Sequence, residues 1–141
     1  MHGGKLLAVR QKQYTGRATV DANDYWCTPG GGVDVGEALL PALERELVEE
    51  LGVKPVIGNL LFVQQFIHGD TEHMEFFFHI TNAADYLELD LSKTTHGAIE
   101  IERVDFIDPA QERVLPELLT NENLAAQLTP GAAPKFFDYT T

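Results

Sequence analysis

Three things are scarce in this chain of 141 residues: cysteine, long apolar runs and positive charge. Cys27 is the single cysteine, which excludes an internal disulfide and is typical of a reducing compartment. No apolar run approaches the roughly 20 residues that a membrane-spanning helix needs, and we see no signal peptide. We therefore expect a cytoplasmic protein that does not bind membranes.

Basic residues are outnumbered, with 10 Lys and Arg against 22 Asp and Glu, and the formal net charge is −12. A surface of this sign repels nucleic acids and anionic membranes, so we expect neither as a partner. A small phosphorylated substrate stays compatible, because a bound metal ion reverses the charge locally. The length suits one domain, so we predict a single domain over residues 1–141, with a tail from about residue 129 that folds back or stays loose.

The chain does contain an unusual segment from Gly31 to Val53, in which a glycine-rich turn leads into an acidic amphipathic helix. Its residues Glu46, Glu49 and Glu50 are spaced i, i+3 and i+4, which places three carboxylates on one face of a helix. Such crowded like charges repel one another, and a divalent cation that prefers oxygen ligands would offset the repulsion. The alternative is a solvated acidic edge held by Arg45.

The turn before this helix, from Thr28 to Glu37, contains three successive glycines. Glycine lets the main chain approach a ligand closely, and the unpaired N–H groups at the start of a helix suit phosphate oxygens. The alternative interpretation is a tight turn with no ligand.

The segment fits the pattern G-x5-E-x7-R-E-U-x-E-E-x-G-U, with U aliphatic, at every fixed position. The matching residues are Gly31, Glu37, Arg45, Glu46, Leu47, Glu49, Glu50, Gly52 and Val53. This pattern resembles the Nudix box of the Nudix hydrolases. The resemblance implies an α/β fold, the Nudix-type α/β/α sandwich with a mixed β-sheet between helices. It also implies that water attacks phosphorus in a nucleoside diphosphate linked to another moiety, of the nucleoside triphosphate or nucleotide-sugar type.

The resemblance also implies roles for individual residues. Mg²⁺, with Mn²⁺ as a substitute, would be held by Glu46, Glu49, Glu50 and the main-chain carbonyl of Gly30. Of the catalytic residues, Glu50 is the best candidate to help deprotonate the attacking water, and Arg45 would orient Glu49.

Five further residues are candidates for substrate binding: Arg10, Arg17, Trp26, Glu100 and Glu102. The two arginines are the nearby cations that can reach a phosphate, although surface positions would explain them equally. Trp26 either stacks on a base or packs under the glycine loop. Glu100 and Glu102 share one face of a strand predicted over residues 98–107, from which many Nudix hydrolases bring a further carboxylate; a solvated sheet face is the alternative.

The remaining pattern predicts strands over residues 5–10, 56–68 and 73–80, a loop over 82–96 and a helix over 108–119. Only four residues precede the first strand, too few to supply the earlier strand that is usual in the resembling family. The sheet edge is therefore either shortened or completed in another way, for example by a second subunit in a homodimer.

The substrate is not specified by the sequence. Residues 67–71 contain neither the proline nor the tyrosine that marks two Nudix subclasses. A non-catalytic nucleotide sensor and a prenyl diphosphate isomerase are alternatives on the same fold. The intact glutamates disfavour a sensor, and Cys27 is poorly placed for the isomerase.

Overall fold

The structure is a computed structural model, and it describes residues 1–12 and 25–138. By its internal contacts the chain forms two compact units, Met1–Pro55 with Asn82–Glu122 and Val56–Thr81 with Asn123–Thr141. The chain leaves the first unit after Pro55 and returns to it at Asn82. A single domain over residues 1–141 stays a prediction.

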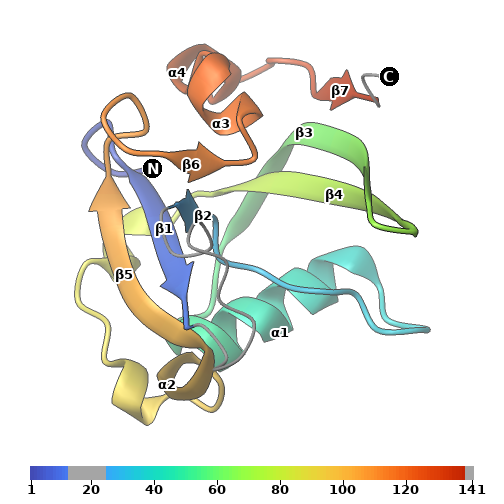
Figure 1. Ribbon diagram of the computed structural model, residues 1–141. Coiled ribbons are helices and arrows are strands. Elements are labelled where there is room, and N and C mark those ends of the chain that lie inside the picture. The colour runs from blue at the N-terminus through green and yellow to red at the C-terminus, as the bar shows by residue number, and fades with distance from the viewer. Residues whose placement is uncertain (13–24, 139–141) are drawn as a thin grey trace. The chain divides into compact units, whose positions relative to one another are not determined.

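The first unit contains a four-stranded sheet in the order β5-β1-β2-β6 (Figure 1). Strand β1 (Leu6–Gln11) pairs antiparallel with β5 (Ile101–Ile107) and with β2 (Trp26–Cys27), and β2 pairs parallel with β6 (Val114–Leu115). The sheet is therefore mixed. Strand β1 has a neighbouring strand on each side, so it does not lie at a sheet edge. A second subunit is therefore not needed to complete the sheet beside β1, and a homodimer stays a prediction.

The helices of the first unit are one long helix and several short turns. Helix α1 (Leu39–Leu51) is the long one. The short ones are η1 (Ala83–Tyr86), η2 (Leu91–Lys93), α2 (Gly97–Glu100) and α3 (Leu118–Asn121). None of the helices in the described part of the chain is long and apolar enough to cross a membrane.

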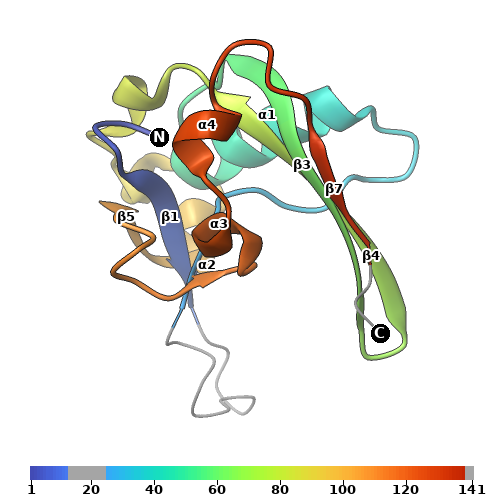
Figure 2. The ribbon, with the colours of Figure 1, turned by 90° about the horizontal axis from the view of Figure 1, so that it is seen from above.

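The second unit is a β-hairpin with one added strand (Figure 2). Strands β3 (Ile57–His68) and β4 (Thr71–Ile80) pair antiparallel through a turn at Gly69, and β7 (Lys135–Phe137) pairs parallel with β3. Gly69 has φ 62°, a conformation that favours glycine. Helix α4 (Leu124–Gln127) precedes β7, so part of the predicted tail is strand.

The predicted mixed α/β class is confirmed, and so are the first strand, the helix of the acidic segment and the strands over 56–68 and 73–80, which pair as a hairpin. The strands, however, pair as two mixed sheets, one in each unit.

Two predicted elements differ from the structure, one at its start and one throughout. The strand predicted over 98–107 starts only at Ile101, because the carbonyl of His96 accepts hydrogen bonds from Ile99 and Glu100 and closes the helical turn α2. Glu100 therefore ends a helix, and its expected place on one strand face with Glu102 is not found.

The helix predicted over 108–119 is also absent. Residues Val114–Leu115 pair with β2 instead, and helix α3 forms only from Leu118. Pro116 lacks the N–H group that a continuous helix would use, which explains why the apolar leucines did not extend the helix backwards.

Candidate functional site

Helix α1 carries the acidic residues of the site. Its apolar side chains Ala42, Leu47 and Leu51 are buried, and this anchors one face of the helix in the first unit. The helix ends at Gly52, which has φ 77° and donates its N–H to the carbonyl of Val48. The helix therefore ends in a left-handed glycine cap.

Glu50 is the buried carboxylate of the site, with only 4% of its surface exposed. Its pKa is raised to about 7, first by burial and also by the nearby charges of Glu46 and Glu100. The main-chain N–H of Gly30 donates to Oε2 of Glu50 at 3.2 Å and, like His96, acts in the opposite direction. A carboxyl group with a pKa near neutrality is suited to gaining and losing a proton.

Arg45 joins the glycine loop to the helix. Its Nε and Nη2 donate to the two carboxylate oxygens of Glu37 at 2.7 and 2.9 Å, which is a bidentate pair. Its Nη1 donates to Glu46 at 3.0 Å and to Glu49 at 3.1 Å, and Nη2 also reaches the carbonyl of Gly32 at 3.1 Å. The ion pair predicted between Arg45 and Glu49 is present, within a larger network.

Glu37 lies at the junction of loop and helix. The Arg45 hydrogen bond lowers the pKa of Glu37 to about 2, helped by the main-chain N–H of Asp34, which donates to Glu37 at 3.1 Å. Glu37 is thus a permanent anion that holds Arg45 beside the loop.

Gly31 lies directly against Glu46. A Cβ atom at this position would overlap the carboxyl group of Glu46, whereas a Cβ at Gly32 would meet nothing within 4 Å. Gly30 has φ 148°, which also favours glycine. The loop backbone therefore approaches the carboxylates closely, as the three glycines predicted.

The neighbouring carboxylates that act on Glu50, those of Glu46 and Glu100, are oxygen ligands of the kind that Mg²⁺ and Mn²⁺ prefer. A Cβ atom at Gly31 would fall on the Glu46 carboxyl group, so glycine keeps the main chain and a carboxylate close together, and such oxygen donors fit a hard cation. In residues 1–12 and 25–138, no three His, Cys, Asp or Glu side chains are grouped as a finished metal site. The carboxylates of Glu46 and Glu49 are turned to Arg45 instead.

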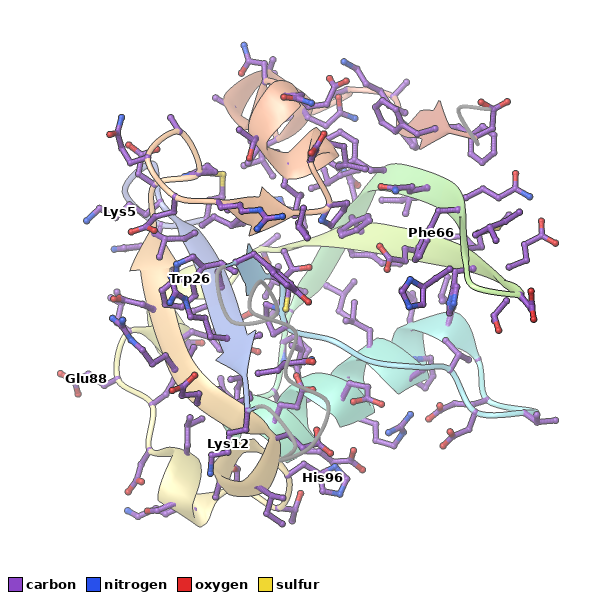
Figure 3. The ribbon with its side chains drawn as sticks, viewed as in Figure 1. Lys5, Lys12, Trp26, Phe66, Glu88 and His96 are labelled. Carbon is purple, nitrogen blue, oxygen red and sulfur yellow. The ribbon has the colours of Figure 1, made fainter. Side chains whose placement is uncertain are left out.

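Two residues at the start of α2, His96 and Gly97, contribute to the site and were not predicted from the sequence. His96, labelled in Figure 3, precedes α2. Its Nδ1 lies 3.1 Å from Glu49 Oε2, and its main-chain N–H donates to the Glu49 carbonyl at 2.9 Å. A Cβ at Gly97 would overlap the main-chain carbonyl of Glu50. These contacts bring α2, and with it Glu100, to the end of α1, and no short-range pattern in the sequence signals them.

The candidate substrate-binding residues differ in their surroundings and in their exposure. Trp26 is 2% exposed, so its ring does not offer a free face to a base. Arg10 lies over that ring, Glu100 raises the pKa of Glu50, and Glu102 is an exposed residue of β5. Arg17 lies outside the described residues.

Comparison with protein families finds a match to the NUDIX domain over residues 1–126. Among curated proteins, the chain is 38% identical over 55 residues to the RNA pyrophosphohydrolase of Bartonella tribocorum. It is 40% identical over 58 residues to the diphosphoinositol polyphosphate phosphohydrolase 2 of Rattus norvegicus. These alignments cover 39% and 41% of this chain and 32% and 31% of those proteins, so the chain matches about a third of the length of each.

Solved structures of the same fold cover more of the chain. The E. coli ORF135 protein superposes with a TM-score of 0.66 at 22% identity, over 94% of this chain and 88% of that one. A UDP-X diphosphatase superposes with a TM-score of 0.64 at 21% identity, over 98% of this chain and 63% of that one. At this identity the likeness concerns the fold.

Proposed function

Since the chain belongs to the Nudix family, we propose that it is a metal-dependent pyrophosphohydrolase that cleaves a nucleoside diphosphate linked to another moiety, by attack of water at phosphorus. The observation that carries the proposal is Glu50, a buried carboxylate with a pKa raised to about 7, placed beside Glu46 and a glycine loop. Arg45 pairs with Glu46 and Glu49, and none of the ion pairs among the described residues includes Glu50, so a divalent cation would offset the cost that remains.

Glu46, Glu49, Glu50 and the carbonyl of Gly30 would hold Mg²⁺ or Mn²⁺. When bound, the cation neutralises charge on the phosphate oxygens and lowers the pKa of a bound water. Glu50 would accept the proton of the attacking water, because it is the carboxylate that the fold buries at the site. Arg45 holds Glu46 and Glu49 close together and offsets their mutual repulsion.

The substrate class is the nucleoside triphosphate or nucleotide-sugar type. The names of the relatives refer to RNA, diphosphoinositol polyphosphates and UDP-X, which share a diphosphate linkage and differ in the attached group. These names support cleavage of a diphosphate bond, and they do not indicate which group is attached to the diphosphate. A small-molecule nucleotide stays our expected substrate, with no nucleic acid, in the cytoplasm.

The alternatives gain no support from the site. A sensor would not need three carboxylates crowded at one metal-binding edge. Cys27, the one candidate nucleophile for an isomerase, donates its Sγ–H to the carbonyl of Val9 at 3.6 Å, within the β1–β2 pair.

A product-release screen tests the proposal. The panel contains canonical and oxidised nucleoside triphosphates, ADP-ribose, UDP-sugars, dinucleoside polyphosphates and a 5′-triphosphorylated RNA oligonucleotide, each with Mg²⁺, Mn²⁺ or EDTA. We expect turnover of one small-molecule class with either metal and none in EDTA. Turnover that survives EDTA would contradict the metal requirement, and selective turnover of the RNA would contradict the expected absence of a nucleic-acid partner. Silence on all substrates, with thermal stabilisation by one nucleotide, would favour the sensor.

A further inference from the structure

Three side chains form a row across neighbouring strands of the first unit: Arg103 on β5, Arg10 on β1 and Trp26 on β2. Arg10 and Arg103 are directly opposite each other in the β1–β5 pair. The antiparallel register of Val9 with Cys27 places Trp26 beside Arg10 on the other side. The guanidinium carbons lie 4.6 Å (Arg10) and 5.3 Å (Arg103) from the centroid of the Trp26 ring, so both arginines lie on the face of the sheet that carries the indole.

This arrangement concentrates positive charge in one place, although the chain as a whole has a strongly negative net charge. Like charges directly opposite each other on paired strands repel. None of the ion pairs formed among the described residues includes Arg10 or Arg103. The indole ring offsets part of the repulsion, because its face attracts cations, but it carries no charge.

The same cluster presents hydrogen-bond donors. Within the described part of the chain, Nε of Arg10 and Nε1 of Trp26 are buried and have no hydrogen-bond partner. Guanidinium and indole N–H groups donate and do not accept. Arg103 is exposed, so its guanidinium is the accessible member of the cluster. Because acceptors and negative charge are what the cluster lacks, an anion rich in oxygen would complement it.

The cluster lies a short way from the carboxylates. Arg103 follows Glu100, the last residue of α2, by three residues, so at most about 10 Å of backbone separates them. Trp26 precedes Gly30, the residue that donates to Glu50, by four residues. The cluster and the carboxylates are thus close enough for two phosphates on either side of one sugar to reach both.

We propose that Arg103, together with Arg10 on the face of Trp26, binds a phosphomonoester group that the substrate carries in addition to the diphosphate that is cleaved. The inference deepens the proposed function, on which it rests for the position of that diphosphate. Arg103 thereby determines specificity: it favours nucleoside diphosphate compounds that bear a second phosphate on a sugar over those that lack it.

A binding experiment without metal tests the subsite directly. Isothermal titration calorimetry in EDTA compares AMP with adenosine 2′,5′- and 3′,5′-bisphosphate. We expect the wild-type protein to bind one bisphosphate about tenfold more tightly than AMP, and Arg103→Gln to erase the difference. Arg113→Gln is the matched control, because it removes the same charge from a guanidinium that lies 5.9 Å from another ring, that of Tyr25. Equal wild-type affinities for all three nucleotides, or an equal loss in both variants, would overturn the inference.

A kinetic experiment separates this inference from the proposed function. It compares substrates that differ in one phosphate, ADP-ribose with its 2′-phosphate and dephospho-coenzyme A with coenzyme A. We expect Arg103→Gln to raise KM about tenfold for one phosphorylated member, with kcat and its unphosphorylated partner nearly unchanged. Turnover that is identical in wild type and variant overturns the subsite and leaves the hydrolase. No turnover of any substrate contradicts the hydrolase, and the binding experiment alone then decides the subsite.

Discussion

Glu50 is a buried carboxylate, and its ionisation lowers the free energy of unfolding of the metal-free protein. Its pKa is 4.5 in the absence of structure and about 7 when folded. A raised folded-state pKa means that the contribution to stability is fully present below pH 4.5 and is lost as pH rises through about 7. The loss amounts to about 3 kcal/mol, from the pKa difference.

We therefore predict that Glu50→Gln flattens this pH dependence, because the amide does not ionise. Urea unfolding in EDTA at several values between about pH 5 and about pH 8 measures it. With Mg²⁺ present, the wild-type protein should regain stability at the upper end of this pH range, because the cation offsets the negative charge of Glu50. The same decline in the wild-type protein and in the variant would show that Glu50 is not its source.

Arg45 makes a different prediction, because its geometry is planar and bidentate. A lysine keeps the charge but cannot bind both oxygens of Glu37 and also reach Glu46. We expect Arg45→Lys to raise the pKa of Glu37 from about 2 toward 4.5. Glu37 stabilises the fold above pH 4.5 and loses this contribution as pH falls through about 2, so the variant should lose less stability in acid.

Carbon-detected NMR titration of the side-chain carboxyl groups measures the Glu37 pKa, and urea unfolding measures the stability. Glu44→Gln is the control, since the exposed pair of Glu44 with Lys54, 3.5 Å apart, contributes little to stability. An unchanged Glu37 pKa in Arg45→Lys would contradict the network described here.

At the scale of elements, the glycine loop and helix α1 act together because a backbone without a side chain lies against Glu46. We predict that Gly31→Ala displaces the Glu46 carboxyl group and weakens Mg²⁺ or Mn²⁺ binding by about tenfold or more, while the fold is retained. Gly32→Ala is the matched control in the next position, where a Cβ has free space. Calorimetric titration with Mn²⁺ measures both. Equal affinities in the two variants would show that the close approach to Glu46 is unrelated to metal binding.

The elements also show which parts of the structure could be predicted. Helix α1 was predicted because the spacing of its glutamates and the glycine-rich turn before it indicate the same helix. The strand predicted over 98–107 was misplaced at its start, since α2 is fixed by the packing of Gly97 against the carbonyl of Glu50, 47 positions earlier in the sequence. Such a contact leaves no local pattern. Strand β6 was not predicted for the same reason, because it forms by pairing of Val114 with Trp26 on a distant segment.

For the whole molecule, the acidic box identified the family from sequence, and the NUDIX domain match over residues 1–126 agrees. The charges of the box could be assigned to one helix face because helix geometry fixes their spacing. The sequence could not show that Glu50 is the buried one, that His96 reaches Glu49, or that Arg103 faces Arg10. Each of these depends on pairing between distant segments.

The central claim is that the carboxylates of α1 serve metal-dependent hydrolysis. The most direct measurement is the rate of product release for the best substrate of the screen, by wild type and by Glu50→Gln, at saturating Mg²⁺ and with Mn²⁺ binding measured in parallel. The account predicts that kcat of the variant falls at least about a hundredfold while the protein stays folded. A variant that keeps wild-type turnover would contradict it.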